Sequence, residues 1–162
     1  MPIQDNHFLC VVLNNQHQNR IDEFLAIHRN DPRRPVLFQP YTERHLRQVH
    51  DLIENSSEPV PVFLVIGNYG QSASAVGLLH SLEYSDEITP ERKQELSQWA
   101  SQFDQPAVYA LNILSVTNLV SFRESLSLSQ FAKKSDGLTL EPGKWPASIC
   151  YVPPLTKLLE AL

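Results

Sequence analysis

Apolar residues occur in this chain in short runs, which polar turns and amphipathic segments separate. The runs near 8–13, 60–66, 75–82, 107–116 and 147–152 are rich in β-branched and aromatic residues, which is typical of strands. A polar, glycine-containing stretch joins the second run to the third, so these two are predicted to form a hairpin. Shorter extended pieces are expected at Val36–Phe38 and at 138–141.

Helical spacing appears between these runs. Residues 19–28 place apolar side chains at i, i+3 and i+4, which predicts an amphipathic helix. Thr42 is a candidate N-cap for a second helix that continues to about Glu54. Thr89 and Pro90 predict the start of a third helix, over 90–103, because proline is tolerated in the first turn. Further helices are predicted at 127–133 and from Pro154 to the end.

The order of these elements predicts an α+β fold with a curved mixed sheet, or a small open barrel, and helices packed outside. A central hairpin and several consecutive strands are incompatible with a regular βαβ doubly wound sheet. The length of 162 residues suits one domain, and we find no repeat or linker that would divide residues 1–162.

Charge narrows the choice of partners. The formal net charge of −5 argues against a general polyanion binder, since lysine and arginine supply most non-specific affinity for nucleic acid. The distribution is uneven, however, because residues 29–50 contain five arginines and residues 83–104 contain six acidic residues. A basic face opposite an acidic one is one interpretation, and ordinary solvated charge is the other.

The two cysteines and the N-terminus bear on location. Cys10 and Cys150 each lie in an apolar run, which favours two buried thiols in a reducing compartment over a bridge. The N-terminus has no basic segment followed by an apolar stretch, and no run reaches the ~18 residues that span a bilayer. We therefore expect a cytoplasmic protein with no membrane partner.

The sequence contains no clear motif for catalysis, phosphate binding or metal binding. The glycine-containing stretch 67–77 lacks the lysine of a phosphate loop and leads into a strand. His45 and His50 are five residues apart, on different faces of one predicted helix, and no cysteine pair accompanies them. The acidic pairs at 22–23 and 86–87 are adjacent residues, whose side chains diverge. We therefore expect no enzyme activity, no metal and no cofactor.

Amide and aromatic side chains indicate a candidate binding function. Asn14 and Asn15 follow the first buried strand, where an amide can pair with the edge of a base. Helix capping by Asn15 or Asn19 is the alternative. Trp99 has the helical spacing of a core residue, but aromatics that a curved sheet gathers can also stack on a base.

A family resemblance connects these features. The buried strand with Asn14–Asn15 and a following His-x-Asn, the hairpin "VFLVIGNYGQSASAVGLLHSLE" with Gly77, and the stretch Tyr109–Phe131 are similar to YTH and EVE domains of the PUA-like superfamily. These domains read a modified base with an aromatic cage. The resemblance implies a PUA-like fold over nearly the whole chain.

The resemblance also implies a site and a function. Asn14, Asn15 and Trp99 would contact the base, and Phe38 or Tyr41 would replace the first cage tryptophan. Arginines of the basic stretch would contact phosphates, namely Arg33, Arg34 and Arg47. The predicted function is recognition of nucleic acid with a modified or flipped-out base, without chemistry. A protein-interaction or regulatory domain of the immunity type is the alternative, for which the net charge of −5 is more natural.

Overall fold

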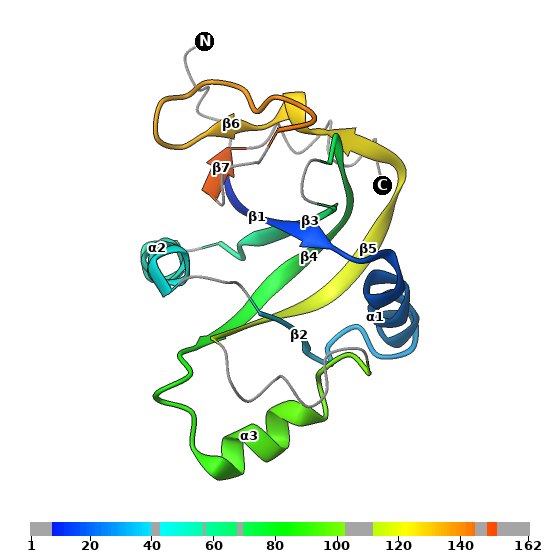
Figure 1. Ribbon diagram of the computed structural model, residues 1–162, viewed down its shortest axis with the longest axis vertical. Helices are drawn as coiled ribbons and strands as arrows, with labels where there is room; N and C mark the ends of the chain where they lie inside the picture. The colour runs from blue at the N-terminus through cyan, green and yellow to red at the C-terminus, as the bar shows by residue number, and fades with distance from the viewer. Residues whose placement is uncertain are drawn as a thin grey trace.

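One curled, mixed β-sheet with helices outside it forms the fold (Figure 1). The computed structural model describes residues 8–39, 43–56, 58–67, 70–102, 112–144 and 149–151. The elements in chain order are β1 (Leu9–Gln16), α1 (Gln18–Asn30), β2 (Val36–Phe38), α2 (Glu43–Glu54), β3 (Pro61–Ile66), β4 (Ser72–Glu83), α3 (Pro90–Ser97), β5 (Ile113–Ser127), the 3-10 helix η2 (Leu128–Gln130), β6 (Ala132–Lys133) and β7 (Ile149–Tyr151). The predicted α+β class with a curved mixed sheet is confirmed.

The sheet has the strand order β2-β5-β4-β3-β1-β7-β6. Only the β1–β3 pair is parallel among these strands, and the other neighbours are antiparallel. A parallel pair needs a long crossover connection, which α1, β2 and α2 supply. The predicted hairpin is the β3–β4 pair, in which Phe63 lies opposite Val76.

Strand residues alternate between two hydrophobic clusters on opposite faces of the sheet. The helix-side core contains side chains of α1 and α2, and its buried members are Val11, Ile21, Phe24, Val36, Phe38, Val49, Leu52, Val60, Val62, Leu64, Ala75, Leu114, Val116 and Leu119. The opposite core contains η2 and the segment after it, and its buried members are Cys10, Val12, Phe63, Val65, Ala73, Val76, Phe122, Leu126, Leu128, Phe131 and Leu140. Both faces of the sheet therefore contribute to stability.

The helix α3 covers a third, smaller cluster of Leu37, Ile88, Leu96 and Ile113. Its start matches the prediction, since Thr89 Oγ1 accepts a hydrogen bond from the Arg92 N–H at 3.2 Å and Pro90 occupies the first turn. Its end does not match, because α3 stops at Ser97 and the chain continues in a turn.

Two other boundaries differ from the predictions. The fifth strand continues to Ser127, well beyond the predicted end at 116. The helix predicted over 127–133 is wrong, since a 3-10 turn and the short strand β6 occupy that stretch. The helix predicted from Pro154 and the predicted strand start at 107 lie outside the described residues. In the part of the chain that is described, no helix combines the length and the apolar character needed to cross a membrane.

Candidate ligand-binding pocket

A pocket of about 740 Å³ lies where α2 ends and β3 begins. Most of its walls are apolar, and these residues are Phe8, Leu9, Leu52, Pro59, Pro61, Val76, Gly77, Leu78 and Val120. The polar residues are fewer, namely Asp51, Asn55, Ser56, Glu58, Asn118 and Lys134. A concave, mainly apolar pocket with a few polar groups is the usual form of a small-ligand site.

An irregularity in β5 shapes one wall of the pocket. Val76 pairs with Val120 but Leu78 pairs with Thr117, so β5 has one residue more than β4 between these pairs. Asn118 takes up the extra length with a φ of 56°, a conformation that asparagine tolerates better than most residues. The bulge leaves Leu119 buried in the helix-side core, while Asn118 and Val120 line the pocket.

Gly77 allows β4 and β5 to approach each other at this bulge. A Cβ atom at this position would lie 2.4 Å from Val116 Cγ1 and 3.0 Å from the Thr117 carbonyl oxygen. Real Cβ contacts are longer than this, so any side chain here would push the two strands apart. The glycine therefore fixes the local geometry of the pocket wall.

The basic turn after α1 is fastened to the same bulge. The Asn118 N–H donates to the Pro32 carbonyl oxygen at 2.7 Å. The Leu119 N–H donates to His28 Nδ1 at 2.7 Å, and His28 Nε2 lies 2.7 Å from the Arg34 carbonyl oxygen. Because Nδ1 accepts, the proton is on Nε2, and the neutral ring bridges the turn and β5.

His28 is only 4% exposed. Burial lowers the pKa of His28, and the Arg34 charge lowers it further, while the hydrogen bond to the Arg34 carbonyl and the Asp31 carboxylate oppose the shift. The neutral form that both hydrogen bonds require is therefore the favoured form.

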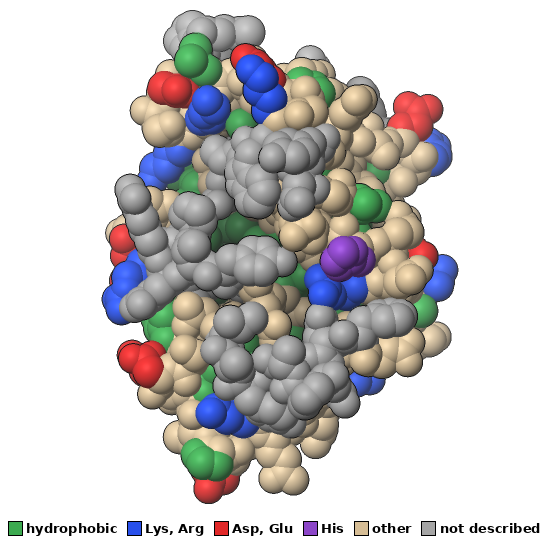
Figure 2. Space-filling view, in the orientation of Figure 1, with side chains coloured by type: hydrophobic (Ala, Val, Ile, Leu, Met, Phe, Trp, Pro, Cys, Tyr) green, Lys and Arg blue, Asp and Glu red, His purple; other side chains and the backbone are tan. Residues whose placement is uncertain are grey.

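Charged groups surround the pocket without a single dominant sign. Asp51 and Glu58 contribute carboxylates to its lining, and Lys134 contributes an ammonium group. On the face that Figure 2 shows, the basic and acidic side chains of the described residues are interspersed toward the edge of the molecule. The arrangement favours a ligand that is largely apolar and has hydrogen-bonding groups at its edge.

The asparagine pair predicted to touch a base lies within the end of β1. Asn15 has a φ of 58°, and the register with β3 shifts between Leu13 and Gln16. The Asn15 N–H donates to the Gly67 carbonyl oxygen at 3.0 Å, and the Gly67 N–H donates to the Gln16 carbonyl oxygen at 3.1 Å. The residue at the N-cap of α1 is His17, so neither Asn15 nor Asn19 has the capping position that the alternative required.

The predicted cage aromatics are separated. Phe38 is 2% exposed in the helix-side core, with its ring edge-on to Phe24 at 5.3 Å between centroids. Trp99 is half-buried and packs against the third cluster, which contains Leu37. Because Leu37 and Phe38 are neighbours in β2, they point to opposite faces, and Phe38 and Trp99 do not share a cavity.

One face of Trp99 already has a partner. The Arg92 guanidinium lies 4.8 Å from the centre of the Trp99 ring, and it also donates to both carboxylate oxygens of Glu83 at 2.6 and 3.0 Å. These hydrogen bonds raise the pKa of Arg92 above its ordinary value. The arrangement ties α3 to β4.

The remaining predicted residues are on the surface or outside the described part. Arg33 is exposed, and Arg34 Nη2 donates to the Gln98 carbonyl oxygen at 2.7 Å. Arg47 is exposed on α2, with its guanidinium 5.1 Å from the Tyr84 ring centre. Tyr41 lies outside the described residues. None of the predicted residues that are described is among those that line the pocket.

The pocket residues could not be predicted from local sequence patterns, because they come from several separate elements. Two signals were present in the sequence. Prolines at 59 and 61 mark the unusual start of β3, and Gly77 interrupts the apolar run at 75–79.

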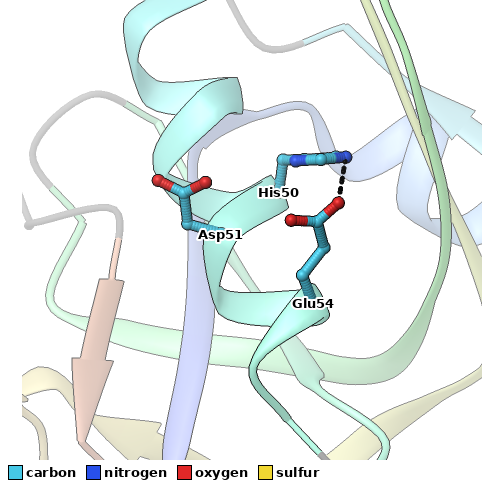
Figure 3. Close-up of side chains that lie close together, drawn as sticks. All are labelled: His50, Asp51 and Glu54. Atoms are coloured by element: carbon cyan, nitrogen blue, oxygen red, sulfur yellow. Dashed lines mark ion pairs between the residues drawn. The ribbon is translucent and has the colours of Figure 1, made fainter.

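Three potential metal ligands lie together on α2, and Figure 3 shows them. His50, Asp51 and Glu54 each place one ligand atom within 4.8 Å of the others. His50 Nε2 and Glu54 Oε1 are 3.4 Å apart, which is the ordinary i,i+4 pairing on a helix. Asp51 and Glu54 are both exposed. The helical pairing accounts for this cluster without an ion.

No protein-family model, curated protein or solved structure matches this chain.

Proposed function

We propose that this chain is a cytoplasmic binding domain that takes a modified or flipped-out base of a nucleic acid into the pocket beside the β5 bulge, and performs no chemistry on it. The observation that carries the proposal is the pocket of about 740 Å³ with apolar walls and amide side chains at its margin. The resemblance of the sequence to PUA-like base readers supports the same function.

The walls suit a flat ring. Val76, Leu78 and Val120 lie on neighbouring strands and present branched apolar side chains to the pocket. Val120 is 46% exposed, which is unusual for a large apolar residue on a strand. A base that enters the pocket would remove this surface from water and gain the contacts that an extruded base needs.

The polar margin offers groups that can pair with the edge of a base. Asn55 and Asn118 each carry a donor and an acceptor. The carboxylates of Asp51 and Glu58 accept hydrogen bonds only, so they favour a base edge rich in donors or a base that methylation has made cationic.

The phosphates would lie toward the basic turn. Asn118 lines the pocket, and its N–H is bonded to the Pro32 carbonyl oxygen, next to the exposed Arg33. Lys134 supplies a second positive charge at the margin. Contacts of this kind position the nucleic acid, while the base in the pocket determines specificity.

The test is binding of short methylated and unmodified oligonucleotides across a salt series. We expect methylated strands to bind more tightly, and affinity for both to fall as salt rises. Val120→Glu should abolish the preference, because a carboxylate would occupy the apolar wall. Leu138→Glu is the matched control, since Leu138 is also exposed, at 59%, but does not line the pocket.

The variant Arg33→Ala distinguishes phosphate binding at the basic turn from base binding in the pocket. It should weaken binding to methylated and unmodified strands about equally and reduce the salt slope by about 1. If the wild-type chain binds neither strand at low salt, the proposal is wrong and a protein partner becomes the better explanation.

A further inference from the structure

The only two cysteines of the chain occupy directly opposed positions in the sheet. Cys10 of β1 is the register partner of Cys150 of β7, between the pairs Leu9–Tyr151 and Val11–Ile149. They are 140 positions apart in the sequence, and the antiparallel β1–β7 pairing brings them together (Figure 1).

Directly opposed residues of an antiparallel pair have Cα atoms roughly 4.5–5.5 Å apart and share one face of the sheet. Disulfides join residues whose Cα atoms are roughly 4.4–6.8 Å apart. The backbone register therefore places the Cα atoms of this pair within the range for a bridge. Cys10 is a fully buried thiol in the present structure.

We propose that Cys10 and Cys150 are a redox-sensitive pair, which a peroxide converts into an intramolecular disulfide that fastens β7 to β1. One thiol gives its sulfur electrons to the peroxide, which forms a sulfenic acid and releases water. The second thiol attacks that sulfur, the S–O bond breaks and a second water leaves. The sum is two thiols and one hydrogen peroxide giving one disulfide and two waters.

The strand β7 is short enough for an oxidant to reach the pair. It has three residues, and it pairs with β1 over three positions and with β6 over two. Local opening of so short a strand needs much less free energy than global unfolding. Closure of the bridge would then prevent that opening.

The bridge would also act on the pocket. Leu9, next to Cys10, lines the pocket, and so does Lys134, whose N–H donates to the Ile149 carbonyl oxygen at 3.4 Å. The strand β7 thus connects two segments of the pocket wall. Oxidation would hold these segments together, whatever ligand the pocket takes.

Intact-mass measurement after hydrogen peroxide treatment tests the pair. The treated chain is denatured, alkylated with iodoacetamide and weighed with and without prior dithiothreitol. We expect a monomer about 2 Da lighter than the reduced chain and unable to react with iodoacetamide, with both thiols restored by dithiothreitol. Because the chain has two cysteines, this species can contain only the Cys10–Cys150 bridge.

Thermal unfolding gives a second readout. A bridge that closes so long a loop should raise the Tm of the wild-type chain by about 10 °C, and the same treatment should leave the Tm of Cys150→Ala unchanged. The proposal is overturned if both thiols of the treated wild type still react with iodoacetamide. It is equally overturned if oxidation yields only disulfide-linked dimers or adducts about 16 Da heavier.

Discussion

The two sides of the β4–β5 pair differ in how they are covered. On one side, Val116 and Leu119 are buried beneath α1 as part of the helix-side core. On the other side, Leu78 and Val120 line a pocket, and Val120 is about half exposed. One residue inserted into β5 at Asn118 separates these environments. The comparison indicates that the covered stretch supplies stability, as the opposite core does further along β5, whereas the open stretch around Val120 is available for a ligand.

The largest effect is expected from removal of a buried side chain in the helix-side core. Phe24 of α1 is fully buried and contacts Phe38 of β2 edge-on. Phe24→Ala should lower the free energy of unfolding by about 3–5 kcal/mol, because it removes a large buried side chain and leaves a cavity. Urea denaturation followed by circular dichroism measures the change. A loss below 1 kcal/mol would contradict a stabilising role for this core.

His28 tests the junction between α1 and β5. His28→Ala should cost about 2–3 kcal/mol, since the buried Leu119 N–H and the Arg34 carbonyl would both lose their partner. The measurement is again the free energy of unfolding in urea at pH 7.5.

Acid should affect the same junction. The folded pKa of His28 lies below its ordinary value of 6.5, so its contribution to stability is complete above pH 6.5 and declines as the pH falls below it. The wild type should therefore lose stability relative to His28→Gln, which cannot titrate, between about pH 6.5 and 5. Parallel stability curves for the two proteins in this interval would contradict the assigned neutral ring.

Gly77 tests the boundary between the two sides. Gly77→Ala should destabilise the fold by about 1–2 kcal/mol, because the new methyl group meets Val116 and the Thr117 carbonyl of β5. Gly70→Ala is not a suitable control, since a Cβ there would also be crowded. The effect on stability should exceed that of any single change to the open wall of the pocket.

The smallest effect is expected in the open stretch around Val120. Val120→Glu should change the free energy of unfolding by no more than about 0.5 kcal/mol, like other exposed substitutions. Leu138→Glu should change the free energy of unfolding by a similarly small amount, and urea denaturation of both variants measures the two changes. A loss of 2 kcal/mol or more in Val120→Glu would show that this residue serves the fold.

Local patterns were sufficient to predict most of the elements. The continuous apolar run at 60–66 and the helical spacing of Ile21 and Phe24 depend on neighbouring residues, and they gave the correct strand and helix. The predicted boundaries were wrong where pairing with a strand distant in the sequence determines where an element ends. Ser121–Ser127 is polar at many positions, yet it belongs to β5 because β4 supplies a partner for it.

The candidate site was harder to predict. The family resemblance implied that Phe38 or Tyr41 would stack on a base, but pairing with β5 brings Phe38 into the helix-side core. The pocket depends on the bulge at Asn118, and nothing in the local sequence marks an inserted residue. Asn14 and Asn15 lie within the end of β1, and Asn15 has a left-handed backbone, which asparagine tolerates better than most residues.

The most direct test of the proposed function is a ¹H–¹⁵N NMR titration of the whole chain with a methylated oligonucleotide. We expect saturable shifts at the amides of Leu78, Asn118, Val120 and Lys134, all of which line the pocket. Smaller shifts should extend to Arg33, where the phosphates would lie. Shifts confined to Asn14, Asn15 and the Trp99 indole, or no shifts with any oligonucleotide, would contradict the assignment of base recognition to this pocket.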